Sequence, residues 1–501
     1  MMSGKRFLLS LFILILSPLM LLAAPLQVCL VSGSEEYDSD TSLTKYREYL
    51  ENNFDVQCTL IKAVGFEELP GTEALKDCDV ALFYTRRLRI DGEALQNVKD
   101  YCLSGKPIVA IRTASHGFQN WLEFDRIVLG GNYRGHYGND ITQEVKILPE
   151  AGDHPVLEGV SAPIRSRYSL YQTSPVADDV TVLMTGTIPG LQKPEPVTWT
   201  RIHNGGRVFY TSLGGLEDFE NETFKRLIAN ALHWTANRNM QMKPQPEPQR
   251  RSKPTGMLKL PLRAKVQTSQ GSEEWKDSME TREIPIANTA IIICDMWDRH
   301  WCRGATERCD AIARKMAPFI DECRDAGIQI IHAPSDTLTF YAGLPQRKRM
   351  QNAARVTLPE PKVIQAPDLP IDDSDGGCDT DDPTYWAWTR QHPAISIGEF
   401  DGISDNGDEI FNFLEQEGID TLLIMGVHTN MCIMNRSFAI CRMTRLGKNC
   451  VLVRDFTDTM YDPKDPPYVT HDEGTRLVIE HIEKYWCPTV TSAEVLAGIT
   501  Q

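Results

Sequence analysis

The sequence is poor in features that would each define a class of protein. Its 13 cysteines include no CxxC pair, and their number is odd, so at least one thiol is unpaired within the chain. This spacing excludes a zinc ribbon and a dense disulfide scaffold. Basic residues are outnumbered by acidic ones, 52 to 68, which gives a net charge of -16. Such a charge disfavours contact with phosphate backbones, so we expect no nucleic-acid partner.

Long hydrophobic runs are also scarce, and the clearest one lies at the start of the chain. Lys5 and Arg6 precede an apolar run over 7–22, and two alanines follow it. A charged start, a short apolar core and a small-residue exit are typical of a secretory signal peptide. The run is shorter than the roughly 20 residues that span a bilayer, although a membrane anchor is the alternative. We predict a signal peptide at 1–24, export to the periplasm or beyond, and no membrane association after its removal.

A proline-rich, polar segment divides the rest of the chain. Residues 239–257 contain four prolines and few apolar residues, which is typical of an extended connector. We therefore predict domains at 26–238 and 285–490, joined by a linker at 239–284. In both halves short apolar runs alternate with helical patterns. This alternation predicts two three-layer α/β domains with mainly parallel sheets.

In the second half, polar residues follow the predicted strands. A buried strand at Thr289–Cys294 leads into Asp295, and a helix over 306–326 comes next. Another strand at Thr421–Met425 runs into the segment Gly426–Cys432. Because the carboxyl ends of parallel strands meet at one edge of a sheet, we expect these polar residues to lie together there.

Cys432 carries the strongest chemical signal in this segment. Residues 433–443 have helical character, so Cys432 lies near a helix N-terminus, where the helix dipole and free N–H groups favour a thiolate and can hold an oxyanion. Asp295 ends a buried strand, which costs free energy unless the carboxylate is paired or used. A buried structural cysteine is the alternative interpretation.

Residues 289–298 and 421–438 resemble the isochorismatase-like cysteine hydrolases, the family of nicotinamidases and N-carbamoylsarcosine amidases. The resemblance extends from 285 to about 490. It implies hydrolysis of an amide-like C–N bond in a small molecule through a covalent intermediate, with Cys432 as nucleophile and Asp295 as acid/base. It also implies a non-proline cis peptide at Val427–His428 and an oxyanion hole formed by the backbone N–H groups of His428 and Cys432.

The chain departs from this family at the third catalytic residue. The family has a lysine at the end of a strand that corresponds to residues 394–400, and no lysine is present there. Glu399 occupies the approximate place and is therefore the third catalytic candidate. Arg390 and His392 are nearby cations that could substitute for the lysine.

Three further residues are candidates for substrate binding, namely Trp297, His332 and Thr429. A structural role is the alternative for His332. The segment after His332 differs in spacing from the Asp-x-His metal pattern of nicotinamidases, so we expect no catalytic metal and no cofactor. The aspartate-rich residues 368–382 do not have the spacing of an EF-hand, and a solvated insertion is favoured over a calcium site.

The first half resembles a different group. Residues 130–136, 154–156 and 196–213 resemble trehalose-utilisation (ThuA-like) domains, which share a fold with class I glutamine amidotransferases. An amidotransferase needs a cysteine at the turn after the third strand, and residues 112–116 contain none. Glutaminase activity is therefore not expected. Arg112, His116 and His136 can still line a small-molecule or sugar cleft, with structural roles as the alternative for the histidines.

Two functions remain open at this point. The first is a cysteine hydrolase acting on a small-molecule substrate. The second is a non-catalytic protein that binds small molecules or carbohydrates at degenerate sites, which the missing lysine and the missing cysteine support. The family resemblance also suggests a homo-oligomer.

Overall fold

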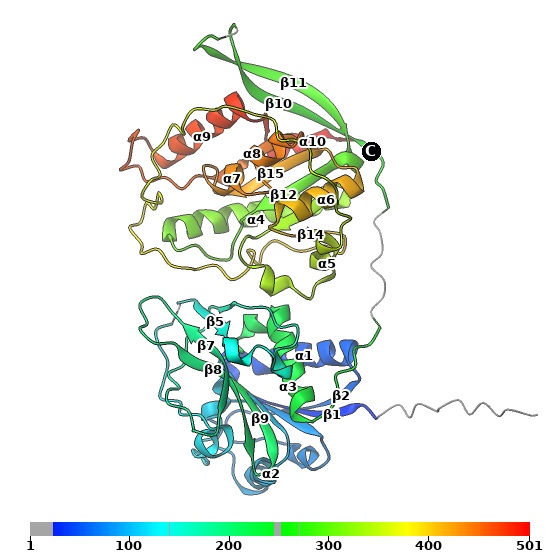
Figure 1. Cartoon of the computed structure of the whole chain (residues 1–501), viewed down its shortest axis with the longest axis vertical. Helices are drawn as coiled ribbons and strands as arrows, with labels where there is room; N and C mark the ends of the chain where they lie inside the picture. Colours follow the sequence, from blue (N-terminus) through cyan, green and yellow to red (C-terminus); the bar gives the residue numbers. More distant parts are fainter. Residues whose placement is uncertain (1–23, 140, 245–251, 270, 501) are drawn as a thin grey trace, which may run out of the picture.

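The computed structural model describes residues 24–139, 141–244, 252–269 and 271–500. Figure 1 shows two α/β bodies, one for each half of the chain, and each contains a nine-stranded sheet. The predicted α/β class is confirmed. The predicted signal peptide at 1–24 lies almost wholly outside the described residues. Within them, no helix combines the length and the hydropathy needed to cross a membrane.

The first sheet is mixed. In spatial order its strands are β2 (Val56–Lys62), β1 (Leu26–Gly33), β3 (Val80–Thr85), β4 (Ile108–Ile111), β9 (Gly206–Thr211), β8 (Glu195–His203), β7 (Thr181–Thr187), β5 (Gln143–Ile147) and β6 (Ile164–Ser166). The strands from β2 to β9 are parallel, and those from β9 to β6 are antiparallel. The α-helices of this body are α1 (Ser39–Asn53), α2 (Gly92–Leu103) and α3 (Glu222–Thr235).

The second sheet is mainly parallel. In spatial order its strands are β11 (Trp275–Pro285), β10 (Met257–Gln267), β17 (Thr489–Val490), β16 (Asn449–Asp458), β15 (Thr421–Val427), β12 (Thr289–Cys294), β13 (Gln329–Ala333) and β14 (Gly402–Ile403), with β18 (Ile499–Thr500) paired to β10. The strands from β17 to β14 are parallel. The helices are α4 (Arg303–Asp325), α5 (Pro345–Gln351), α6 (Gly407–Glu417), α7 (Cys432–Asn435), α8 (Ile440–Arg445), α9 (His471–Tyr485) and α10 (Ser492–Gly498).

The central strands of the second sheet, β12 and β15, could be predicted from their apolar runs because they are completely buried. Every residue of β12 and of β15 is buried, as expected for parallel strands that are covered on both faces. Helix α4 buries Ala313, Met316, Phe319 and Ile320 at helical spacing on one face. The strands and this helix therefore share one core, and the ends of β12 and β15 lie side by side.

The predicted linker at 239–284 is wrong in its second half. Strands β10 and β11 form an antiparallel hairpin within it, and β10 also pairs with β17 of the second sheet. Leu258, Leu260 and Leu262 alternate with more exposed residues and pack into the core beside β12. This period of two was hidden in a polar context, because β11 is largely exposed and projects beyond the body (Figure 1).

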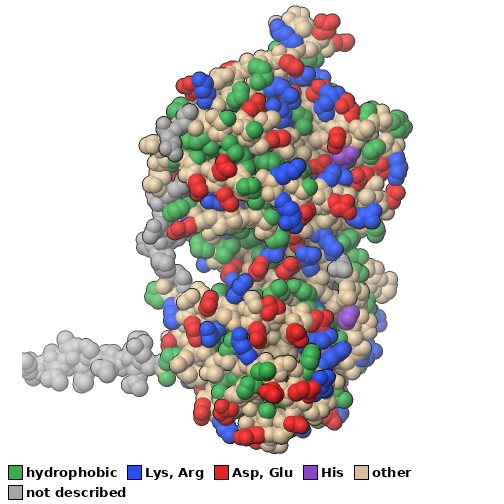
Figure 2. All heavy atoms as spheres, turned by 180° about the vertical axis from the view of Figure 1, so that it is seen from behind, with side chains coloured by type: hydrophobic (Ala, Val, Ile, Leu, Met, Phe, Trp, Pro, Cys, Tyr) green, Lys and Arg blue, Asp and Glu red, His purple; other side chains and the backbone are tan. Residues whose placement is uncertain are grey.

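The two bodies touch through specific side chains. The Thr142 hydroxyl donates to the Ala387 carbonyl at 2.8 Å, and the Arg165 guanidinium lies 4.1 Å from the centre of the Trp386 ring. Figure 2 shows acidic and basic side chains interspersed over both bodies on the face in view. These contacts join the first body to residues 386–387 of the second, and further hydrogen bonds reach Asp336 and Thr339.

Gly426 provides a test of how closely β12 and β15 approach. Its φ is +121°, and an added Cβ would lie 2.0 Å from the Cys294 carbonyl oxygen. We expect Gly426→Ala to lower the free energy of unfolding by about 3 kcal/mol or more, because it adds a backbone clash to an unfavourable φ. Urea unfolding measures the change.

Gly447→Ala is the matched control for this substitution. Gly447 has a φ of +92°, and no described atom lies within 4 Å of its added Cβ. This variant isolates the cost of the backbone conformation, about 1–2 kcal/mol. Equal destabilisation by the two variants would contradict the close approach of the strands.

Candidate active site

The ends of two neighbouring strands bring the predicted catalytic residues together. Cys294 at the end of β12 is paired with Gly426 in β15. Asp295 follows the first strand directly, and Cys432 is the first residue of α7 after the second. The predicted cis peptide at Val427–His428 is present. The sheet edge expected from the sequence therefore carries both residues.

Asp295 is the centre of the site. Its side chain is fully buried, and its Oδ1 accepts a hydrogen bond of 2.8 Å from the Ser335 backbone N–H. Its Oδ2 accepts one of 2.8 Å from Arg436 Nε. The Cys432 thiol lies close enough for Asp295 to raise the pKa of the thiol. The carboxylate is thus hydrogen-bonded to a guanidinium and a backbone donor, with the sulfur nearby.

Burial and the charge of Arg436 have opposite effects on the pKa values of Asp295 and Cys432. Burial raises the pKa of Asp295, while Arg436 and the hydrogen bonds to Cys432 and Ser335 lower it. Burial also raises the pKa of Cys432, and the Asp295 charge adds to this rise. Arg436 and the His428 backbone N–H act to lower the pKa of Cys432. The resting pair is therefore a thiol next to a carboxylate that is more basic than usual.

The structure corrects the third catalytic candidate. The Glu399 side chain is exposed, whereas the group beside Asp295 is Arg436. Nor does Arg390 or His392 fill this place, because Arg390 pairs with Glu220 and His392 with Asp310.

The sequence does contain a signal for Arg436. Arg436 lies four residues after Cys432, and its backbone N–H donates to the Cys432 carbonyl at 3.1 Å. Residues four apart on a helical turn are neighbours. A cation one turn after the nucleophile is therefore a local sequence signal for Arg436, which caps the end of α7. The family lysine lies on a different segment, at residues 394–400.

Two of the predicted substrate-binding residues have structural roles instead. His332 is fully buried, and its ring nitrogens contact Gln391 Oε1 and Asp401 Oδ2, both at 2.9 Å. The Thr429 hydroxyl is hydrogen-bonded to that of Thr457 at 2.7 Å. Both side chains are fully buried, and their polar atoms already have partners within the protein.

Trp297 lies next to the catalytic cluster. Its ring stacks on Trp388 with 4.3 Å between centroids, and the Arg436 guanidinium lies 6.0 Å from its centre. Burial lowers the pKa of the adjacent His300 to about 2 and that of His428 to about 4, so both rings are neutral at pH 7. The aromatic side of the site is therefore uncharged, and the charges near Cys432 are those of Asp295 and Arg436.

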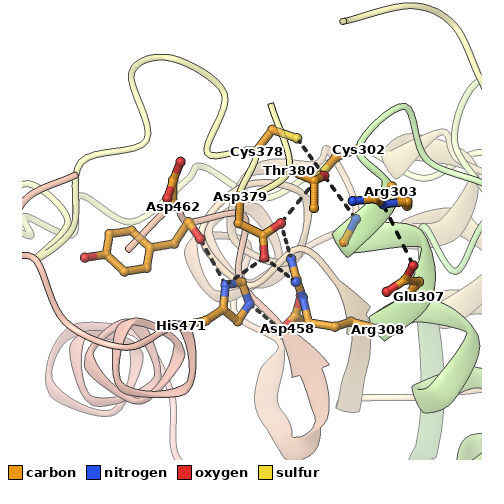
Figure 3. A network of polar contacts seen from close by, with 12 residues as sticks. Cys302, Arg303, Glu307, Arg308, Cys378, Asp379, Thr380, Asp458, Asp462 and His471 are labelled. Atoms are coloured by element: carbon orange, nitrogen blue, oxygen red, sulfur yellow. Dashed lines mark hydrogen bonds and ion pairs between the residues drawn. The ribbon is translucent and has the colours of Figure 1, made fainter. Parts of the chain in front are cut away.

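A polar network fixes the loop that carries the nucleophile. The Thr429 backbone N–H donates to the Asp458 carbonyl at 2.7 Å. The Asp458 carboxylate contacts His471 Nε2 and Arg308 Nε, both at 2.9 Å (Figure 3). Arg308 also pairs with Asp379 of the aspartate-rich insertion. These contacts hold the strand end and the insertion in one place.

The first body has a cavity of its own. Arg112 stands at the turn after β4, with a φ of +45°, and the rings of Tyr37, Tyr168 and Tyr171 surround its buried guanidinium. A cavity of about 360 Å³ lies nearby and is lined in part by His116.

The polar groups at this cavity are close but not arranged as a catalytic triad. Ser115 Oγ lies 3.2 Å from His116 Nδ1, and burial together with Arg87 and Arg86 lowers the pKa of His116 to about 3. The His136 Nδ1 instead contacts the Tyr137 carbonyl. The cavity therefore suits ligand binding better than nucleophilic catalysis.

Comparisons with known proteins agree with the two-part resemblance. The family model described as trehalose utilisation (ThuA) matches residues 27–235. Similar solved structures include a ThuA-like protein from Parabacteroides merdae, with 16% identity, a TM-score of 0.36 and coverage of 45% of this chain and 94% of that one. A cysteine hydrolase from Pseudomonas syringae pv. phaseolicola has 17% identity, a TM-score of 0.29 and coverage of 43% and 93%.

An isochorismatase from Pseudomonas putida is also similar, with 12% identity, a TM-score of 0.27 and coverage of 42% of this chain and 91% of that one. No curated protein matches the sequence. The ThuA match falls inside the predicted first domain, and both groups resembled by the sequence occur among the structural neighbours.

The position of Arg436 predicts the reactivity of Cys432. Because Arg436 lowers the pKa of the thiol, we expect Arg436→Gln to slow alkylation of Cys432 by iodoacetamide, by roughly tenfold for each unit of pKa. Peptide mass spectrometry measures the rate at Cys432. Arg442→Gln on α8 removes the same charge elsewhere and should leave the rate unchanged. Unaltered alkylation in Arg436→Gln would show that Arg436 does not support the thiolate.

Proposed function

We propose that the second body hydrolyses an amide-like C–N bond of a small molecule, with Cys432 as nucleophile. One observation carries this proposal: the buried Asp295 carboxylate accepts a hydrogen bond from Arg436 Nε, and its charge raises the pKa of the neighbouring Cys432 thiol. A buried carboxylate of raised pKa next to a thiol is suited to general base catalysis. The resemblance to isochorismatase-like hydrolases supports the same assignment.

The reaction follows from these contacts. Cys432 Sγ forms a bond to the carbonyl carbon while its proton passes to Asp295. The C–N bond then breaks, and Asp295 returns the proton to the leaving nitrogen. Water next attacks the thioester carbon and loses a proton to Asp295, which restores the thiol as the acid product leaves. These steps balance with the two side chains and one water molecule.

Arg436 takes the part of the family lysine. Its charge keeps Asp295 ionised in a buried position, where an unpaired carboxylate would be protonated. The same charge lowers the pKa of Cys432. Arg436 is partly exposed, with 32% of its side chain accessible, so it can also face a substrate. A guanidinium from the nucleophile's helix thus replaces an ammonium from a strand.

The oxyanion would form beside two backbone donors. The family resemblance assigns the N–H groups of His428 and Cys432 to this role. The His428 N–H lowers the pKa of the Cys432 thiol, and Cys432 begins α7. Donors placed at the developing negative charge are often the largest contribution to acyl transfer. The aromatic wall of Trp297 and Trp388 favours a flat or apolar group on the substrate.

Location and assembly complete the proposal. The charged and apolar start of the chain supports export, which places the substrate in the periplasm or outside the cell. The resemblance to the isochorismatase-like family supports a homo-oligomer, in which the active site of each copy would act separately.

Loss of the nucleophile tests the proposal. With a panel of small amides and carbamoyl compounds, we expect Cys432→Ala and Asp295→Asn to lower kcat/KM by at least about a thousandfold, because each removes a group that handles the proton or the carbon. Arg436→Lys should retain more activity than Arg436→Gln. Cys441→Ser, at a buried cysteine of α8, is the control. Equal turnover by Cys432→Ala and wild type would exclude the mechanism.

The cavity of the first body favours a second function, the binding of a small polar or carbohydrate ligand. The rings of His116 and Tyr133 stack with 4.3 Å between centroids, and Asp125 lies in the lining with a pKa that burial raises to about 6. Asp125 Oδ1 has no hydrogen-bond partner among the described residues. Aromatic faces with a few convergent polar groups are typical of small-ligand sites.

Thermal shift with a panel of mono- and disaccharides tests this second function. We expect at least one saccharide to raise the Tm of wild type and of Cys432→Ala by the same amount, since the cavity and the thiol lie in different bodies. The saccharide should not be converted to a product. Tyr133→Ala should abolish the shift, because it removes the stacked ring. A shift that survives in Tyr133→Ala but is lost in Cys432→Ala would assign the ligand to the hydrolase site.

A further inference from the structure

Two cysteines from distant segments meet beside the start of α4. Cys302 immediately precedes that helix, and Cys378 comes from the aspartate-rich insertion (Figure 3). Both are buried, and Asp382 of the same insertion is half-buried. The two Sγ atoms and a carboxylate oxygen of Asp382 all lie within 4.8 Å of one another. Neither sulfur takes part in a disulfide.

The insertion is shaped to deliver Cys378 to this place. Gly376 and Gly377 precede it with φ values of +95° and +64°, which favour glycine. A Cβ on Gly377 would lie 2.4 Å from the Met460 carbonyl oxygen. The turn is also anchored to the nucleophile loop, because Asn430 Nδ2 donates to an Asp373 oxygen at 2.6 Å. The position of Cys378 is therefore set by a tight and well-fastened turn.

A hydroxyl group completes the cluster. Thr380 Oγ1 lies 3.4 Å from Cys302 Sγ and 3.5 Å from Cys378 Sγ, and it also contacts the Asp382 carboxylate. Two sulfurs and two oxygens thus face one point. Two cysteines with one carboxylate and a further oxygen are a donor set that zinc accepts.

The two arginines near the cluster already have acidic partners. Arg308 is held by Asp379 at 2.6 Å and by Asp458 at 2.9 Å, so its charge is compensated. Arg303 is exposed and reaches toward Glu307, away from the sulfurs, as Figure 3 shows. If both thiols lost their protons, the two thiolates would be negatively charged. Among the residues drawn in Figure 3, both arginines already pair with carboxylates, so neither would offset that charge.

We propose that Cys302, Cys378 and Asp382 bind one thiophilic divalent cation of the zinc type. On binding, both thiols release their protons to solvent, and the two sulfurs and a carboxylate oxygen each donate an electron pair to the metal. The Thr380 hydroxyl or a water takes the fourth position. The metal fastens the insertion to the start of α4 and has a structural role, since none of its ligands belongs to the Asp295–Cys432–Arg436 cluster.

Metal analysis of the full chain tests this site. Protein purified without chelator is measured by inductively coupled plasma mass spectrometry, and we expect about one zinc ion per chain. Cys302→Ser and Cys378→Ser should each reduce the content by about tenfold or more. Cys441→Ser, at another buried cysteine of the same body, should retain it. Circular dichroism confirms that each variant is folded.

A second measurement keeps the test decisive if the serine variants do not fold. Wild-type protein stripped with chelator is titrated with Co²⁺, and we expect the charge-transfer absorption of thiolate-bound cobalt. Wild type that holds no metal and shows no such absorption would overturn the proposal. A disulfide-linked Cys302–Cys378 peptide, about 2 Da lighter than the two thiol peptides together, would also overturn it. Retention of zinc by both serine variants would do the same. None of these readouts requires a substrate, so they are independent of the hydrolase assignment.

Discussion

The ion pair between the buried Asp295 and the partly exposed Arg436 is the constraint on which the chemistry of the second body depends. A fully buried carboxylate would cost several kcal/mol if it stood alone. The guanidinium at 2.8 Å and the Ser335 N–H at 2.8 Å offset that cost and hold the carboxylate in one orientation. Because Arg436 belongs to the helical turn that starts at Cys432, the same turn supplies the sulfur and the cation. Any change that moves this turn displaces both partners of Asp295 at once.

The sheet makes this meeting possible. Strands β12 and β15 are adjacent and parallel, so their carboxyl ends deliver Asp295 and the Cys432 loop to the same edge. Gly426 leaves no room for a Cβ against the Cys294 carbonyl, and Asp458 at the end of β16 fixes Thr429 from the other side. The network around Asp458 then reaches the insertion through Arg308 (Figure 3). The nucleophile loop is therefore held between two strand ends and one inserted segment.

The parts that could be predicted from sequence are those with a strong local pattern. The apolar runs of β12 and β15 predicted buried strands, and the polar residues that follow them predicted the site. Arg436 was missed because the family pattern places the third catalytic residue on the strand where Glu399 lies, whereas Arg436 lies four residues after the nucleophile. The hairpin of β10 and β11 was missed because its apolar residues alternate with charged ones and directly follow the proline-rich segment. In both cases the deciding contact lies between segments that are far apart in the chain.

The contacts between the bodies give the first body a part in shaping the site of the second. Residues 386–390 run along the boundary between them. Trp388 turns inward and stacks on Trp297 beside the catalytic cluster. Two residues further on, Arg390 forms an ion pair with Glu220, which precedes α3 of the first body. One short segment thus faces the proposed substrate wall on one side and the first body on the other. Asp298 of the second body accepts hydrogen bonds from the Thr389 backbone N–H at 2.9 Å and from its hydroxyl at 2.6 Å, while Glu220 of the first body pairs with Arg390. Both bodies therefore hold the segment that carries Trp388, and the first body helps to keep that wall in place.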